Sequence, residues 1–290
     1  MSEPTRKVAI VTDSISSMSQ AMGREYGVHV VPIHIQFGAN SYLDDVNLDS
    51  NRFYSLLAAN HHLPTTSQPT AHDFLQVYQE LAGKAAEIVS IHASKKVSAT
   101  VDSARVACKE LPDVPIHVVD CENLSMGQGL IVIAAARAAD AGKRGEEIVQ
   151  LVERLIPKVK VLFTVETLEY LRRGGRIGGA TALLGSALKI KPVLHIADGQ
   201  VEPLEKPRTR KRAVARLLEL MTEQVGDAET VHAGVLHCHA PEEAEKLAQQ
   251  MADQFNCVEL VITEAGPTIG THGGPGTVGV TFYPGSALGA

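Results

Sequence analysis

Short apolar runs alternate with longer amphipathic segments through the first half of the chain. The apolar runs, rich in Val and Ile, lie at residues 7–11, 28–37, 87–93 and 116–120. Helical patterns lie at residues 52–59, 71–81, 99–109 and 124–141. Strands that alternate with helices of this length are typical of βαβ units, so we expect a mostly parallel sheet.

The carboxyl ends of these strands are the expected ligand side, because ligands of parallel sheets bind beyond them. They are followed by Thr12-Asp13-Ser14, by the loop at residues 92–97 and by Asp120-Cys121. Pro32 interrupts the second apolar run. Proline has no N–H to donate to a sheet, so Pro32 marks an edge or a bend.

The second half of the chain has a different pattern. A helix at 145–155 ends at Pro157, and a new series of strands follows at 160–165, 190–196, 229–237, 258–263 and 277–283. Helical patterns occur at 168–172, up to 188, at 210–225 and at 242–254. Asp198-Gly199 suits a two-residue type I′ hairpin turn. We therefore predict an α/β protein of two domains: a βαβ domain over 1–157, and an α+β domain with a mixed sheet over 158–290.

Composition and charge exclude several classes of function. The net charge is −6, aromatic residues are 4% of the chain and Trp is absent, which disfavours a nucleic-acid partner. The four cysteines form no CxxC pair. The start of the chain lacks the apolar region of a secretory signal, and no apolar run approaches the length of a membrane span. These observations predict a soluble protein of the reducing cytoplasm.

The segment TTSQPT, from Thr65 to Thr70, holds more hydroxyl groups than a turn requires. Thr70 and Asp73 have the spacing of a capping box, which accounts for Thr70. Thr65, Thr66 and Ser67 remain without a capping role. They are either ordinary loop residues or, together with Gln68, donors to a polar group.

Three further segments carry candidate binding residues. Ser98 follows a predicted strand and opens a helix, where free N–H groups attract an anion, although a plain capping role explains it equally well. His272 lies between Thr271 and several glycines near the end of the chain, and the alternative is a solvated loop histidine. The run EKPRTRKRA, from Glu205 to Ala213, is either a solvated helix start or the source of an arginine for a carboxylate or phosphate.

Signals for metals, cofactors and catalysis are weak. His237 and His239 share one face of a strand, but no further ligand is evident nearby. Asp44-Asp45 is better explained as a solvated loop pair than as a cation site. The GxGxxG at Gly274, Gly276 and Gly279 precedes a strand, whereas a dinucleotide site requires a helix there. The chain also lacks GxSxG, a P-loop and HExxH. We predict no metal, no cofactor and no catalytic residue.

Several segments, in order, resemble those of the DegV-like family of bacterial fatty-acid-binding proteins. They are VTDS at 11–14, TTSQPT at 65–70, VSAT at 97–100, LEYLRRGGRI at 168–177, IKPVL at 190–194, DGQVEPLEKPRTRKRA at 198–213 and THGGPG at 271–276. Each motif alone is modest, but their joint order and spacing are specific. The resemblance covers essentially the whole chain.

This resemblance implies a protein that holds one long-chain fatty acid, with the acyl chain in an apolar tunnel and the carboxylate at the domain interface. Carried over by motif, the carboxylate ligands are Thr66, Ser98, Arg208 and His272, with Ser67 and Gln68 in support. The implied partner is a separate fatty acid kinase, which converts the bound acid to an acyl phosphate. Ala99 stands where the family has glycine, which leaves in question whether this turn has the backbone conformation of the family.

Two other functions compete with a lipid carrier. Ser98 as nucleophile and His272 as base describe an acyl hydrolase or transferase, but no motif activates the serine and no acidic partner of the histidine is evident. The third hypothesis is a regulatory or structural protein in which the fatty acid is only a folding ligand.

Overall fold

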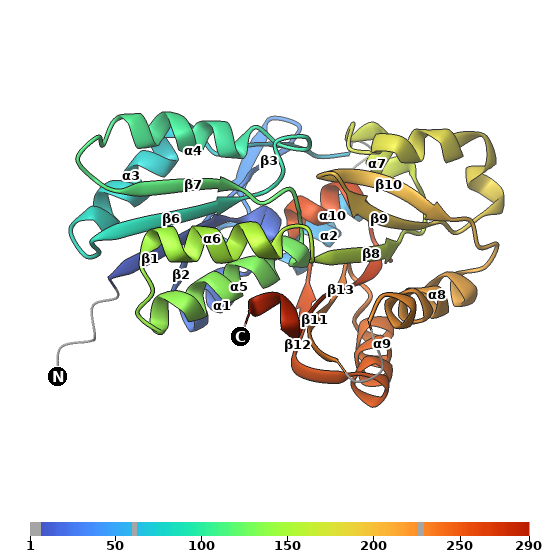
Figure 1. Cartoon of the computed structure of the whole chain (residues 1–290). Helices are drawn as coiled ribbons and strands as arrows, with labels where there is room; N and C mark the ends of the chain where they lie inside the picture. The colour runs from blue at the N-terminus through green and yellow to red at the C-terminus, as the bar shows by residue number, and fades with distance from the viewer. Residues whose placement is uncertain (1–6, 60–62, 226–228, 290) are drawn as a thin grey trace.

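The four parallel strands of the N-terminal sheet direct their carboxyl ends toward the second half of the molecule (Figure 1). This computed structural model describes residues 7–59, 63–225 and 229–289. The strand order is β2-β1-β6-β7. The strands are β1 (Val8–Asp13), β2 (Val28–Val31), β6 (Glu87–His92) and β7 (Ile116–Asp120). The predicted parallel sheet is confirmed.

Helices cover both faces of this sheet (Figure 1). One face carries α3 (Ala71–Ala82) and α4 (Thr100–Lys109). The other carries α1 (Gln20–Tyr26), α5 (Met126–Asp140) and α6 (Gly145–Leu155). In α6, the spacing of Ile148, Val152 and Leu155 places all three on the buried face.

The predicted strand at 28–37 is divided between two sheets. Its first part is β2, and its second part, β3 (His34–Phe37), pairs antiparallel with β4 (Asn40–Leu43) and β5 (Thr65–Ser67). The break falls at Pro32, which cannot donate to a neighbouring strand. Helix α2 (Ser50–Ala59) joins β4 to the segment before β5. The hydroxyl-rich segment is therefore an edge strand of a small sheet rather than a loop.

The C-terminal sheet is mixed, as predicted, with the order β10-β9-β8-β13-β11-β12. Only β11 and β12 run parallel; the other pairs are antiparallel. The strands are β8 (Lys160–Thr164), β9 (Val193–Ala197), β10 (Gln200–Glu205), β11 (Thr230–His237), β12 (Asn256–Glu264) and β13 (Val278–Pro284). Helices α8 (Arg210–Gln224) and α9 (Pro241–Gln254) pack against the sheet.

Shorter elements connect these layers. They are the 3-10 helices η1 (Ser14–Ser16), η2 (Gly178–Lys189) and η3 (Gly285–Leu288), and the α-helices α7 (Glu169–Arg173) and α10 (Pro267–Gly273). Asp198 and Gly199 both have positive φ, 48° and 74°, as the predicted type I′ turn requires. The segment up to Lys189 is a 3-10 helix rather than the expected α-helix.

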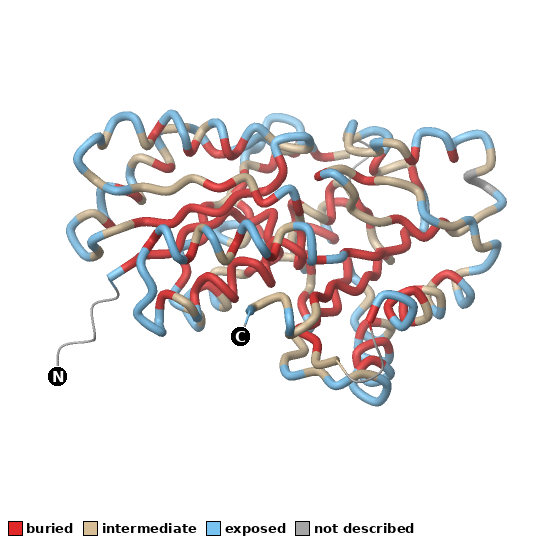
Figure 2. The backbone as a smooth tube through the Cα atoms, viewed as in Figure 1, coloured by how far each residue is buried: buried red, intermediate tan, exposed pale blue. Residues whose placement is uncertain are grey.

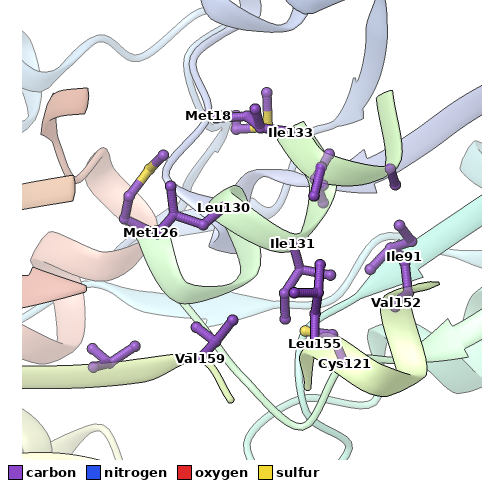
Figure 3. Packing of buried hydrophobic residues seen from close by; sticks show 14 of the residues in the cluster. Met18, Ile91, Cys121, Met126, Leu130, Ile131, Ile133, Val152, Leu155 and Val159 are labelled. Carbon is purple, nitrogen blue, oxygen red and sulfur yellow. The ribbon is translucent and has the colours of Figure 1, made fainter. Parts of the chain in front are cut away.

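Helix α5 lies between the two sheets and contacts strands of both (Figures 1 and 2). Every residue of α5 is buried except Arg137, Ala138 and Asp140. Its side chains join those of α6 and of both sheets in one apolar cluster (Figure 3). The largest core thus crosses from one half of the molecule to the other. Among the described helices, none combines the length and the apolar character needed to cross a bilayer.

Candidate functional site

A cavity lies at the carboxyl ends of the N-terminal strands, as predicted from the topology. Its empty volume is about 840 Å³, which includes open solvent at its mouth. Residues that follow three of these strands contribute to its wall: Ile15 follows β1, Ser98 follows β6 and Ser125 follows β7. The C-terminal half closes the cavity through β8, β10, β11, α10 and the loop after α7.

Most of the wall is apolar and comes from both halves of the chain. The apolar lining residues are Ile15, Ile33, Val97, Leu124, Val161, Phe163, Leu171, Val201, Leu236 and Ile269. The wall also includes polar side chains, namely Thr66, Ser67, Gln68, Ser98, Ser125, Arg176, Thr268, His272 and Thr277. Such a cavity suits an apolar ligand with a polar group.

Thr66 and His272 meet at this cavity, with 2.8 Å between the threonine Oγ1 and the imidazole Nε2. Thr66 is the middle residue of β5, and it is more buried than its neighbours Thr65 and Ser67 because alternate residues of a strand point to opposite sides. His272 lies in the last turn of α10, a helix that the sequence did not predict.

His272 is held as a neutral imidazole. Burial and the nearby positive charge of Arg176 lower its pKa to about 4. Its Nδ1 is buried and has no hydrogen-bond partner among the described residues. Gly174 packs directly against this ring: a Cβ at that position would collide with Nδ1. The imidazole thus acts as a hydrogen-bonding group and not as a cation at neutral pH.

Arg176 supplies a positive charge to the cavity wall. Its Nε donates to the carbonyl of Val97 at 3.1 Å, and its Nη1 donates to the carbonyl of Gly174 at 2.8 Å. The first of these bonds joins the loop after α7 to the loop that carries Ser98. The guanidinium is therefore fixed in place, with its Nη2 unused by any described residue.

Ser98 lies in the turn that precedes α4. Its hydroxyl is 2.7 Å from that of Thr100, and it accepts a long hydrogen bond, 3.4 Å, from the Thr100 N–H. Ala99 has a φ of −80°, an ordinary value for any residue. The replacement of the family glycine by Ala99 therefore introduces no backbone strain into this turn.

Ser67 and Gln68 are exposed at the rim of the same cavity. Thr70 is the predicted N-cap of α3: its hydroxyl accepts from the Asp73 N–H, and the Asp73 carboxylate accepts from the Thr70 N–H. The hydroxyl groups of this segment therefore have separate roles. Thr70 begins a helix, while Thr66, Ser67 and Gln68 are among the residues that line the cavity.

Arg208 lies elsewhere. It is exposed in the connection between β10 and α8 and is not among the residues that line the cavity. The structure places Arg176 at the cavity instead. The sequence offered a signal for this residue in the glycine-rich RRGGRIGG, since glycines let a backbone approach a ligand closely.

Helix α10 begins against Asp44, whose carboxylate is fully buried. Asp44 Oδ2 accepts hydrogen bonds from the Ser14 hydroxyl at 2.8 Å and from the Thr268 N–H at 3.3 Å. Burial raises the pKa of Asp44 to about 6. Asp44 thus connects the N-terminal half to the helix that carries His272, and it is not the solvated loop residue that the sequence indicated.

A surface hollow adjoins the polar residues of the cavity. Thr66, Arg176 and His272 line both spaces, and the hollow adds Leu63, Pro64, Thr65, Tyr170, Arg173, Gly174 and Thr271. The polar cluster is therefore at the end of the cavity that faces the surface.

The described side chains form neither a metal site nor a hydrogen-bonded Ser98–His272 pair. No group of three or more His, Cys, Asp or Glu residues among them is arranged to hold a metal ion. Ser98 and His272 form their hydrogen bonds with Thr100 and Thr66, not with each other.

Comparison with known proteins agrees with the motifs. Residues 7–285 match the family model described as "Uncharacterised protein, DegV family". The chain belongs to the DegV family. It is 39% identical over 278 residues to a DegV domain-containing protein of Halalkalibacterium halodurans, covering 96% of this chain and 98% of that protein. Protein DegV of Bacillus subtilis is 33% identical over 276 residues, covering 95% and 98%.

Solved DegV structures have the same two-domain fold. A DegV family protein of Thermus thermophilus, described for its fatty acid binding, superposes with a TM-score of 0.90 at 34% identity and covers 96% of this chain and 99% of its own. DegV of Bacillus subtilis, described as a fatty acid binding protein, gives a TM-score of 0.89 at 32% identity, with coverage of 96% and 99%.

Proposed function

We propose that this DegV protein binds a long-chain fatty acid and presents it to a fatty acid kinase for acyl-phosphate formation. The observation that carries the proposal is the cavity itself: an apolar wall with Arg176, Thr66 and His272 gathered at the end that adjoins the surface. The two solved relatives described as fatty acid binding support it.

The polar cluster has the chemistry of a carboxylate site. Arg176 supplies a permanent positive charge, and its free Nη2 offers two N–H donors. Thr66 and Ser98 offer hydroxyl groups, and neutral His272 hydrogen-bonds Thr66 and so orients its hydroxyl. In this proposal the carboxylate ligands are Arg176, Thr66, Ser98 and His272, with Ser67 and Gln68 at the rim.

The acyl chain supplies most of the binding free energy. Burial of about 14 methylenes at roughly 0.8 kcal/mol each contributes on the order of 11 kcal/mol before ordering costs. The polar cluster therefore fixes the orientation of the ligand. It keeps the carboxylate at the surface end, where a separate kinase reaches it through the hollow beside Tyr170 and Arg173.

Native mass spectrometry of the purified protein tests the binding step. We expect a bound mass of a C16–C18 acid, and titration with palmitate should displace it. Incubation with a fatty acid kinase and ATP tests the second step, and acyl phosphate should form only when the DegV protein is present. A protein that stays empty when palmitate is supplied would contradict the proposal.

The same preparation distinguishes a hydrolase. Release of acid from an acyl ester, lost in Ser98→Ala, would favour the enzymatic reading over a carrier. Binding without any kinase-dependent acyl phosphate would favour a structural role for the lipid.

A further inference from the structure

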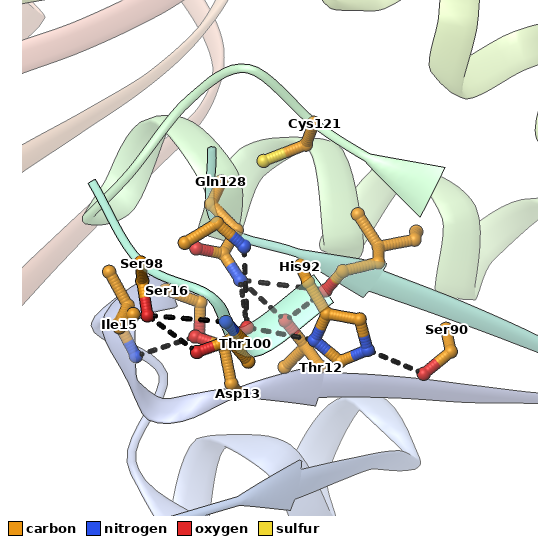
Figure 4. A network of polar contacts seen from close by, with 12 residues as sticks. Thr12, Asp13, Ile15, Ser16, Ser90, His92, Ser98, Thr100, Cys121 and Gln128 are labelled. Carbon is orange, nitrogen blue, oxygen red and sulfur yellow. Dashed lines mark hydrogen bonds and ion pairs between the residues drawn. The ribbon is translucent and has the colours of Figure 1, made fainter. Parts of the chain in front are cut away.

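The segment Thr12-Asp13-Ser14 at the end of β1 contributes no side chain to the cavity, yet all three residues are buried and hydrogen-bonded. Thr12 donates to the Ile91 carbonyl, and Ser14 donates to Asp44. Asp13 is fully buried and accepts four hydrogen bonds. These bonds come from different segments of the chain, and Figure 4 shows them converging beside α5.

Three of the four donors belong to segments that form the cavity wall. The Ile15 N–H donates to Asp13 Oδ1 at 3.0 Å, and Ile15 itself lines the cavity. The Ala93 N–H donates to Oδ2 at 3.3 Å, at the start of the turn that leads to Ser98. Gln128 Nε2 donates to Oδ2 at 3.2 Å from the first turn of α5, just after Ser125.

The fourth donor is His92, whose Nδ1 lies 2.8 Å from Asp13 Oδ2. Because a carboxylate oxygen can only accept, Nδ1 of His92 carries the proton of this hydrogen bond. On the other side of the ring, Nε2 lies 2.7 Å from the Ser90 hydroxyl, whose oxygen accepts from the Tyr78 hydroxyl. This Ser–His–Asp series resembles a catalytic triad, but all three residues are fully buried and none lines the cavity.

We propose that Asp13 is a positioning residue for the binding cavity. Its carboxylate holds η1, the turn before α4 and the start of α5 in one fixed arrangement, so that Ile15, Ser98 and Ser125 face the same space. The two ends of the network have different consequences. The Asp13 end fixes the cavity wall, whereas the Tyr78 end joins α3 to β6, away from the cavity.

This difference supplies a matched pair of variants. Asp13→Asn keeps the size of the side chain but points an amide toward N–H donors, so it separates the three segments. Tyr78→Phe removes one buried hydrogen bond of the same network and leaves every bond to Asp13 intact. Both variants lower the melting temperature, but only Asp13→Asn acts on the cavity.

The palmitate affinity of both variants tests the inference. This experiment rests on the proposed function, because it requires that the protein binds palmitate. Loss of a hydrogen-bonded buried charge predicts a decrease of about tenfold or more in Asp13→Asn and no change in Tyr78→Phe. In a Ser98→Ala background the effect of Asp13→Asn should shrink, because part of that effect acts through the position of the Ser98 hydroxyl. Equal losses in the two network variants, or full additivity with Ser98→Ala, would overturn the inference.

Amide hydrogen exchange on the lipid-free protein gives a second readout that needs no ligand. Asp13→Asn should speed exchange in residues 14–17 and 93–98, and Tyr78→Phe should not. If Asp13→Asn does not fold, Gln128→Leu replaces it in this experiment. This variant removes one donor to Asp13, and the Oε1 of Gln128 that is lost with it has no described partner. It should give a smaller change in the same segments. Unchanged exchange would refute the positioning role, whereas absence of palmitate binding to the wild type would refute only the proposed function.

Discussion

Thr66 and His272 are 206 positions apart in the sequence, yet the threonine Oγ1 and the imidazole Nε2 are 2.8 Å apart. The contact joins an edge strand of the N-terminal half to a short helix of the C-terminal half. Arg176 makes a second connection across the same region through the Val97 carbonyl. The polar end of the cavity therefore exists only when both halves are folded against each other.

Replacement of Arg176 identifies the positive charge that the ligand requires. Arg176→Ala should weaken palmitate binding by about tenfold or more, because a charge-assisted hydrogen bond contributes roughly 1.5–3 kcal/mol. Arg208→Ala is the matched control, since Arg208 is exposed and outside the cavity. This variant should bind palmitate with the affinity of the wild type. Isothermal titration with palmitate measures both. A larger loss of affinity in Arg208→Ala than in Arg176→Ala would show that Arg208, the residue indicated by the family resemblance, binds the carboxylate.

Gly174 tests the placement of His272. A Cβ in Gly174→Ala would collide with the imidazole, so the ring must move and its contact with Thr66 must break. We expect weaker palmitate binding and a loss of roughly 1–3 kcal/mol in the free energy of unfolding. Gly185→Ala is the control, because nothing lies within 4 Å of a Cβ there. Two variants with the same affinity would contradict the geometry.

The pKa of His272 predicts one component of the pH dependence of stability. Its folded value of about 4 lies below the ordinary 6.5, so the folded protein binds fewer protons than the unfolded chain between these pH values. Stability is therefore lost as pH falls from 6.5 to 4, by up to about 3 kcal/mol. His272→Gln should remove this loss. Urea unfolding of both proteins at several pH values measures the difference, and parallel curves would argue against a buried neutral imidazole.

Asp44 has the opposite effect. Its pKa is raised from 3.8 to about 6, so the folded protein binds more protons than the unfolded chain in that window, and stability falls as pH rises through it. In Asp44→Asn this component disappears. The variant should then lose more stability than the wild type on acidification from pH 6 to pH 4. A variant with the wild-type pH profile would show that Asp44 is ionised normally.

The packing of α5 predicts cooperative unfolding. Ile131 is fully buried in the cluster that both sheets share, so Ile131→Ala should cost about 2–5 kcal/mol. Val106→Ala, at a side chain that is 50% exposed, should change stability little. Both proteins should unfold in one transition when followed by circular dichroism and by tyrosine fluorescence. Two separated transitions would show that the halves fold independently.

The periodicity of the sequence was sufficient for the layers of the fold. Alternating apolar runs predicted the parallel sheet, and Asp-Gly predicted the hairpin between β9 and β10, because both signals are local. It was not sufficient for β5, which has only the three residues Thr65–Ser67 and is a strand through its pairing with β3. Helix α10 was missed because His272 is surrounded by glycines, which are poor helix formers.

The arginine of the site shows the limit of reasoning from motifs. Arg176 and Arg208 both lie in segments that resemble the family, and both have further basic residues nearby. Arg176 follows two glycines, whereas Arg208 follows a proline. Which of the two arginines faces the cavity depends on how η2 and β10 pack in the folded protein. That is a tertiary arrangement, which a local motif does not specify. The other candidate residues reach one cavity because each lies within, or at the end of, an element whose position the topology determines. They are Thr66, Ser67, Gln68, Ser98 and His272.

Helix α5 has no polar face that could be exposed to solvent, since all of its residues except Arg137, Ala138 and Asp140 are buried. A fragment ending near residue 157 would keep this helix but lose the sheet that covers its other side. The complementary fragment would expose the apolar surface of β8 and β11 that α5 now covers. We therefore expect that cutting the chain at the predicted domain boundary does not give two separately expressed, folded proteins.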